Sequence, residues 1–417
     1  MSNFWELIKF IMQTFPVMIT DLRYLLIMGV VFLLVYRQYS KVLNYEKRMF
    51  NLNRINPLLE TITALVYGIG GGLVATALFV ILGVSLSNTG IVYLWITAIL
   101  LMLVHPRFLC FAYAGGLISL VSLLTGYPQL DIPALMALVA ILHLAESFLI
   151  FVNGYHNSSP MYFKHSSGEI VGGFSLQKFW PMPTVALLGV AILSSGADFQ
   201  SIAMPEWWPI FEMGIEVPAN HTFVHVLFPI VVALGYSDFA QTELPKTKAR
   251  RSAGLLLVYS LVLLALAILG NKLQVFVVLA AVFAPLGHEM VVQWGQRREK
   301  ENPPVFRSKE GVMVLEVYPG SPAEKMGLVS GDVIKSINGT IVRTLPELSS
   351  EMTPWLIDPV FVVENRFKSP RERIVEFQGK VPPLGIIPTP HPQQGVYVQI
   401  KVGPLKRWLR RLWAKRK

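Results

Sequence analysis

Residues 311–342 read GVMVLEVYPGSPAEKMGLVSGDVIKSINGTIV, and this stretch decides how the C-terminal part of the chain folds. Apolar residues recur with the strand period over 312–317, which predicts a β-strand that ends at the following turn residues. Ser321 and Pro322 have the residue types of an N-cap and of a first helical position, which predicts a short helix. The Asn-Gly pair at 338–339 lies between two further apolar runs and predicts a tight hairpin.

The same stretch strongly resembles a PDZ domain of the bacterial type, in which a GSPAEKAGL-like helix is followed by GDVI and an Asn-Gly turn. The resemblance covers residues 305–402 and implies a β-rich domain that binds an extended peptide as an added strand, opposite a helix. No carboxylate-binding loop of the GLGF type precedes the first strand. PPLGII at 382–387 has this character instead, which implies a circularly permuted PDZ domain.

The resemblance assigns the peptide-binding groove to two segments, the loop at 382–387 and a helix that begins near TLPELSSEM at 344–352. Filling the core of the domain is the alternative role for each apolar side chain in these segments. The residues expected to form the groove, first on the loop and then on the helix, are Leu384, Gly385, Ile386, Ile387, Leu345 and Leu348.

The segment 403–417 is rich in Lys and Arg and contains no acidic residue. Its Leu and Trp residues recur at helical spacing, and the cations take the other face. This pattern is typical of an amphipathic helix that lies on an anionic membrane leaflet, and we prefer this interpretation to nucleic-acid binding. The residues expected to carry the lipid contact are Lys406, Arg407, Trp408, Arg410, Arg411 and Trp413.

Residues 1–295 are expected to form an α-helical polytopic membrane domain, joined to the PDZ domain by a linker at 296–304. Of the whole chain, 53% is hydrophobic and only 15% is charged, which is typical of helices that lie in lipid. We expect about eight or nine transmembrane helices. The apolar runs that predict them lie at 20–36, 62–84, 91–104, 108–125, 132–152, 181–196, 222–237, 254–270 and 274–293.

The connections between these runs predict the orientation. Residues 37–56 and 246–251 are rich in Lys and Arg, whereas 197–221 contains acidic residues and neither Lys nor Arg. Short basic loops stay in the cytoplasm, so the chain after residue 295 is expected to be cytoplasmic and 197–221 to face outward. The connection at 158–180 is then cytoplasmic and is a second candidate docking surface, with simple helix capping as the alternative.

His288 and Glu289 lie in an apolar run and raise the question of an intramembrane metalloprotease. The zinc motif HExxH needs a second histidine at position 292, where this chain has Val292, so the usual site is incomplete. We expect a polar cluster that pairs internally and fixes helix packing, with a solute path or a metal site as alternatives. The residues expected in this cluster are His143, Glu146, His225, His288 and Glu289.

The single cysteine, Cys110, lies in an apolar run and is expected to be a small core residue. One cysteine cannot form an intramolecular disulfide. We expect neither a cofactor nor a resident metal.

Three further segments resemble the MinJ-type proteins of Gram-positive rods. They are SSPMYFKHSSGEIVGGFSLQKFWPMP at 158–183, GYSDFAQT at 235–242 and APLGHE at 284–289. A polytopic membrane region that ends in one PDZ domain is also similar to this family. The resemblance implies an adaptor in division-site selection, which links the curvature-sensing scaffold DivIVA to the membrane-bound ATPase MinD and is enriched at septa and poles.

The expected function is therefore that of a non-catalytic adaptor in the cell membrane, which presents its PDZ domain to protein partners and to the anionic inner leaflet. No nucleic acid is expected as a partner. Two alternatives stay open. One is a divergent or inactive intramembrane metalloprotease gated by the PDZ domain, and the other is a small-solute transporter that uses His143 and Glu146.

Overall fold

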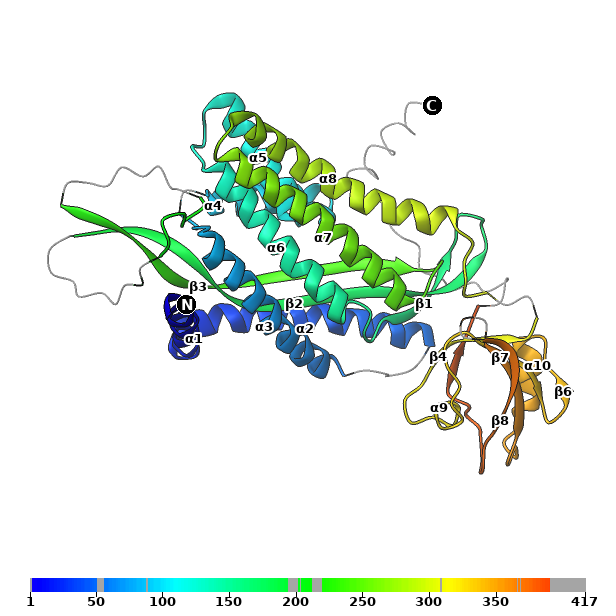
Figure 1. Ribbon diagram of the computed structural model, residues 1–417. Helices are drawn as coiled ribbons and strands as arrows, with labels where there is room; N and C mark the ends of the chain where they lie inside the picture. The colour runs from blue at the N-terminus through cyan, green and yellow to red at the C-terminus, as the bar shows by residue number, and fades with distance from the viewer. Residues whose placement is uncertain are drawn as a thin grey trace, which may run out of the picture.

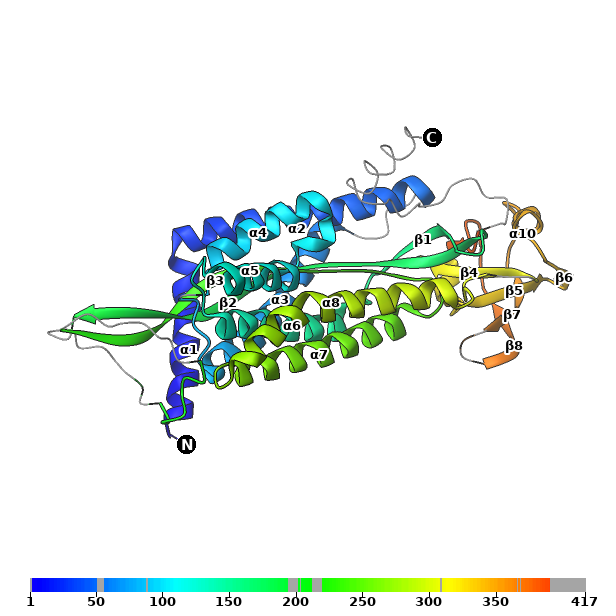
Figure 2. The same cartoon turned by 90° about the horizontal axis from the view of Figure 1, so that it is seen from above.

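The structure is a computed structural model. It describes residues 2–50, 56–87, 89–193, 202, 204–211, 220–307, 310–365, 367 and 369–390. A bundle of helices surrounds a long β-hairpin, and a smaller β-rich domain lies at one end of that hairpin (Figure 1). Figure 2 shows the hairpin running between α2 on one side and α6, α7 and α8 on the other.

The helices of the bundle follow most of the predicted apolar runs. In chain order they are α1 (Ser2–Thr20), α2 (Leu22–Phe50), α3 (Pro57–Leu82), α4 (Ile91–Val104), the 3-10 helix η1 (Pro106–Leu109), α5 (Phe111–Thr125), α6 (Ile132–Asn153), α7 (Pro245–Gly270) and α8 (Gln274–Glu301). Among the described residues, five helices are long and apolar enough to cross a membrane, namely α2, α3, α6, α7 and α8, and α4 and α5 are shorter apolar helices. The structure therefore does not confirm eight or nine spans.

The prediction of helices at 181–196 and 222–237 was wrong. These residues belong largely to β2 (Ile170–Leu193) and β3 (His221–Ala240), which pair antiparallel from Phe174 opposite Ala240 to Leu193 opposite His221. Both runs are apolar and contain proline, which disfavours a helix interior, but an apolar run by itself does not distinguish a buried strand from a helix.

The connection at 158–180 is not a loop. Its first part is β1 (Ser159–Lys164), which pairs antiparallel with the beginning of β2, so the three strands form one sheet in the order β1-β2-β3. The segment is long because it contains a hairpin of its own.

Glycines in α3 let this helix approach the hairpin closely. A Cβ atom at Gly68 would collide with the carbonyl oxygen of Pro181, and one at Gly72 would collide with that of Pro183. Gly71 faces the side chain of Leu149 on α6 in the same way. The helix thus packs on one side of β2 and also against α6, which is buried along most of its length.

The C-terminal domain contains the predicted strand, helix and turn in the predicted order. Its elements are β4 (Val312–Val317), α9 (Pro322–Lys325), β5 (Asp332–Ile337), β6 (Thr340–Ile341), α10 (Leu345–Glu351), β7 (Val360–Asn365), β8 (Ser369–Glu376) and β9 (Ile386–Pro388). Ser321 caps α9, and its side chain accepts a hydrogen bond from the backbone N–H of Glu324. Asn338 and Gly339 both have positive φ, as a tight turn between β5 and β6 requires.

The sheet has the order β8-β7-β5-β4-β9, with β6 paired to β5. Among the described residues, the last strand, β9, therefore lies at an edge beside the first strand of the domain. The linker predicted at 296–304 is mostly helical, because α8 continues to Glu301. At about 1.5 Å per residue, the 28 residues of α8 span more than the thickness of the hydrocarbon core of a bilayer, and the end of this helix lies beside the PDZ domain (Figure 2).

Candidate peptide-binding edge and intramembrane cluster

The loop before β9 is held against the start of α9. The backbone N–H of Tyr318 donates to the carbonyl oxygen of Gly385 over 2.9 Å, and the N–H of Ala323 donates to that of Leu384 over 3.0 Å. Gly385 has a φ of 79°, and a Cβ atom there would collide with the side chain of Ser321. Only glycine fits this position without strain, so the loop predicted to bind a carboxylate is defined by its backbone.

The backbone of β9 has one side paired and one side facing outward. The N–H of Thr389 donates to the carbonyl oxygen of Met313 on β4, and the carbonyl of Gly385 also points to this side. Backbone groups alternate along a strand, so those of Ile386 and Pro388 point to the opposite side, where an added strand would pair. Proline has no N–H, and the carbonyl oxygen of Pro388 accepts a hydrogen bond from the hydroxyl of Tyr162.

The six residues predicted for the groove take three different positions. Leu384 and Leu348 are buried in the core of the PDZ domain, and Ile386 and Leu345 are partly buried against that core. Ile387 points to the other face and is buried in the core cluster that contains residues of the hairpin, since side chains alternate along a strand. Gly385 forms the turn. The structure thus leaves Ile386 and Leu345 as the partly exposed apolar pair.

The PDZ domain is docked on the base of the hairpin through its first residues and its edge strand. Phe306 is fully buried, and its ring lies 5.1 Å from that of Phe174 on β2. The N–H of Gly172 donates to the carbonyl oxygen of Phe306 over 3.1 Å. Tyr162 on β1 reaches Pro388, and burial raises the pKa of its hydroxyl. The hydroxyl therefore stays protonated and remains a donor.

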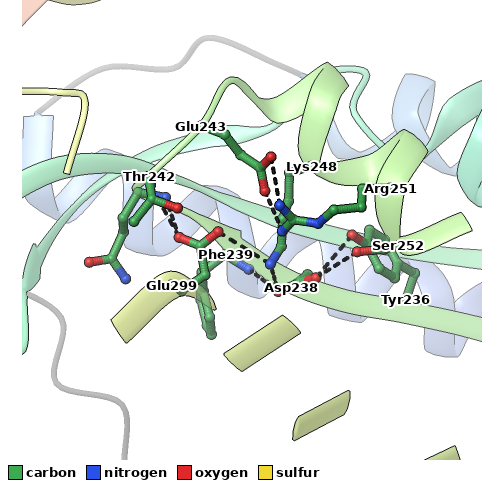
Figure 3. Close-up of polar contacts among 10 residues, drawn as sticks. Tyr236, Asp238, Phe239, Thr242, Glu243, Lys248, Arg251, Ser252 and Glu299 are labelled. Atoms are coloured by element: carbon green, nitrogen blue, oxygen red, sulfur yellow. Dashed lines mark hydrogen bonds and ion pairs between the residues drawn. The ribbon is translucent and has the colours of Figure 1, made fainter. Parts of the chain in front are cut away.

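A buried ion cluster fixes the helices at this same end. Lys248 at the start of α7 is fully buried, and its Nζ lies 3.3 Å from Asp238 on β3 and 3.2 Å from Glu299 on α8 (Figure 3). Glu299 also accepts hydrogen bonds from the backbone N–H groups of Gln241 and Thr242. This cluster was not predicted, although Asp238 lies in GYSDFAQT, Lys248 in the basic segment 246–251 and Glu299 in the predicted linker 296–304.

Two of the five residues predicted for the intramembrane cluster come together with a third that was not predicted. The rings of His143 on α6 and His288 on α8 have centroids 5.2 Å apart. Cys110, which directly precedes α5, has its Sγ 3.1 Å from Nε2 of His143 and 3.7 Å from Nε2 of His288. Sequence spacing gave no signal for this residue, because Cys110 lies on a different segment from either histidine.

Glu289 and His225 have other surroundings. Glu289 accepts hydrogen bonds from Tyr113 and Gln293 and forms an ion pair with Arg107 at 3.3 Å. His225 lies on β3, where its ring contacts that of Trp208 edge to face at 4.9 Å. Glu146 is three residues from His143 on α6, and no hydrogen bond or ion pair connects it with another described residue. The tail residues Lys406, Arg407, Trp408, Arg410, Arg411 and Trp413 lie outside the described residues.

Comparison with known proteins identifies one domain and one relative. Residues 313–352 match the family of the PDZ domain. The chain is 27% identical over 219 residues to the cell division topological determinant MinJ of Bacillus subtilis (strain 168). The match covers 52% of this chain and 51% of MinJ, so it spans about half the length of that relative. These two findings confirm the predicted resemblance to MinJ-type proteins that carry a PDZ domain.

Proposed function

We propose that this chain is a non-catalytic adaptor, anchored in the cell membrane, which uses its PDZ domain to recruit proteins of division-site selection. The observation that supports this most directly is the outward side of β9. It has a glycine-defined loop at one end, partly exposed apolar side chains beside it, and a firm attachment to the membrane domain. The name of the relative MinJ, a cell division topological determinant, supports a role in choosing the division site.

The ligand of this edge is a short C-terminal peptide rather than a long internal strand. Ile386 presents both an N–H and a carbonyl to the outward side, whereas Pro388 presents only a carbonyl, which Tyr162 already engages. A ligand strand can therefore form both backbone hydrogen bonds with only one residue of β9, Ile386. Its binding must depend on the carboxylate held by the loop and on one apolar side chain packed between Ile386 and Leu345.

The surroundings of Glu289 support a non-catalytic role. In a zinc protease the glutamate beside the first histidine activates water, but here Tyr113, Gln293 and Arg107 all engage this carboxylate. By resemblance, the partners of the adaptor are DivIVA and MinD, and the PDZ domain faces the cytoplasm. We also retain the tail at 403–417 as the contact with the anionic leaflet.

Fluorescence imaging of a tagged chain in a rod-shaped Gram-positive cell tests this proposal. We expect enrichment at septa and poles for the wild-type protein. The variant Gly385→Ala, which distorts the loop, should reduce recruitment of a PDZ-dependent partner, whereas Gly339→Ala, in a turn of similar φ away from the groove, should not. A uniform membrane signal for the wild-type protein would contradict the division role.

A further inference from the structure

Cys110, His143 and His288 place three metal-binding atoms around one point inside the helical bundle. The sulfur and the two imidazole nitrogens all lie within 4.8 Å of one another. They come from three different parts of the bundle, namely the start of α5, the middle of α6 and the middle of α8. We propose that these three side chains form a site for a Zn²⁺-type metal ion.

The distances fit a tetrahedral ion. Zinc binds sulfur at about 2.3 Å and imidazole nitrogen at about 2.0 Å, so the ligand atoms of a tetrahedral site lie about 3.5 Å apart. The two distances from the sulfur of Cys110, 3.1 Å to His143 and 3.7 Å to His288, lie on either side of this value. The sulfur is therefore already at the distance from both imidazoles that a tetrahedral ion requires.

The hydrogen bonding of His143 prepares its Nε2 for a cation. Its Nδ1 lies 2.7 Å from the carbonyl oxygen of Val139, which can only accept, so Nδ1 carries the proton and Nε2 presents a lone pair to the sulfur. A backbone carbonyl that accepts from the second ring nitrogen is the usual orienting partner of a metal-binding histidine. Without a metal ion, the thiol of Cys110 can donate its single proton to only one of the two imidazoles. A cation bound by the thiolate would instead attract a nitrogen lone pair from each imidazole.

Aromatic side chains hold the two imidazoles in place. Tyr259 packs edge to face on both rings, with centroids 5.5 Å from His143 and 5.6 Å from His288, and its hydroxyl donates to the carbonyl oxygen of Ala284 over 2.8 Å. Tyr113 contacts the ring of His288 at 5.2 Å. The donors are therefore fixed by packing before any ion binds, as a specific metal site requires.

The charges near the three ligands favour a divalent ion. Glu146 shares a helix face with His143, and a carboxylate in a candidate membrane span without a partner is costly. A divalent cation, the thiolate of Cys110 and this carboxylate together have no net charge. A donor set of one sulfur and two imidazoles suits zinc and disfavours magnesium and calcium, which prefer oxygen. The three ligands come from the start of α5, from α6 and from α8, so a bound ion would join these elements.

Metal analysis of the full-length protein, purified in detergent without chelators, tests the site. We expect about one zinc ion per chain, since one sulfur and two imidazole nitrogens supply three of the four ligands of a tetrahedral zinc site. Cys110→Ser, His143→Gln and His288→Gln should each lower the zinc content at least about tenfold when measured at limiting free zinc. His225→Gln removes a histidine outside the cluster and is the matched control, which should retain the zinc.

Cobalt gives a second readout that does not depend on the resident metal. Co²⁺ added to metal-free wild-type protein should produce the absorption bands of a tetrahedral ion with a thiolate ligand, and Cys110→Ser should lose the thiolate band. A wild-type protein with neither zinc nor this cobalt spectrum would overturn the site, as would equal metal loss in His225→Gln. Either result leaves the adaptor proposal intact, because septal imaging does not depend on the metal.

Discussion

The hydroxyl of Tyr162 donates a hydrogen bond to the carbonyl oxygen of Pro388 over 2.9 Å. This bond joins β1 of the membrane domain to the edge strand of the PDZ domain, and it occupies an acceptor that an added peptide strand would use. If a peptide pairs with β9 as proposed, the membrane domain and the peptide would compete for this one carbonyl group. In that case Pro388 would affect both the attachment of the PDZ domain and the length of peptide that it binds.

Tyr162→Phe should release this carbonyl and strengthen the binding of longer peptides. One hydrogen bond contributes about 1 kcal/mol net, so we expect affinity to rise roughly fivefold for a peptide that extends past Pro388. The probes are fluorescein-labelled peptides of three and of six residues, each with a free apolar C-terminus, and anisotropy is measured with the full-length protein in nanodiscs. The shorter peptide should be unaffected.

Tyr45→Phe is the control for this measurement, since Tyr45 is exposed on α2. Weaker binding of the longer peptide to Tyr162→Phe would show that the tyrosine supports the groove and does not compete with the ligand.

Gly385→Ala should weaken carboxylate recognition. Alanine at a φ of 79° costs about 1–2 kcal/mol, and here its Cβ atom also meets Ser321, so the loop must move. We expect peptide affinity to fall at least about tenfold, which corresponds to 1.4 kcal/mol or more. Gly339→Ala has a similar backbone strain at a φ of 81° with open space around it, and should change stability but not affinity. Equal affinity losses in both variants would argue against a role for the loop in binding.

The PDZ domain was predictable because its signals are local. Ser321 caps the next turn of chain, and Asn338 and Gly339 form a turn by themselves, so short windows of sequence contain the whole physical cause. The hairpin of β2 and β3 was not predictable in this way. Its two strands pair across a connection of more than twenty-five residues, and their apolar composition satisfies the criterion for a membrane helix equally well.

The polar groups show the same distinction between local and distant causes. His143 and His288 were candidates because an ionisable residue in an apolar run needs a partner. Cys110 was not, since an apolar environment is ordinary for cysteine and only the packing of α5, α6 and α8 brings its sulfur to the histidines. From the sequence, Lys248 was interpreted as one cation of a basic connection, whereas in the structure it is buried between Asp238 and Glu299.

Lys248→Met should destabilise the protein strongly, because it leaves two carboxylates near each other without their buried cation (Figure 3). Removing one partner of a buried ion cluster costs about 3–5 kcal/mol. We expect a clear decrease of the melting temperature in detergent, measured by tryptophan fluorescence.

The double variant Lys248→Met with Glu299→Gln should recover part of the loss, because one of the two uncompensated charges is removed as well. Lys246→Met, at an exposed position in the same turn, serves as the control. An unchanged melting temperature for Lys248→Met would show that the cluster does not hold this end of the bundle.

Two glycines of α3 give opposite predictions for the same substitution. In a helix interior alanine is more favourable than glycine by about 1 kcal/mol, so Gly70→Ala, which meets only the ring of Phe148 at 3.9 Å, should leave stability unchanged or raise it. Gly68→Ala places a methyl group against the carbonyl oxygen of Pro181, so either α3 or β2 must move and the close contact between helix and hairpin is lost. We expect Gly68→Ala to lower the free energy of unfolding by about 1–3 kcal/mol, the usual cost of overpacking.

Thermal unfolding of the two variants side by side in detergent measures the difference. Intrinsic helix propensity cancels in this comparison, because both are glycine-to-alanine changes in one helix. If both variants gain stability equally, α3 does not pack on the β2 backbone, and the interpretation of residues 181–193 as a strand rather than a membrane helix fails with it.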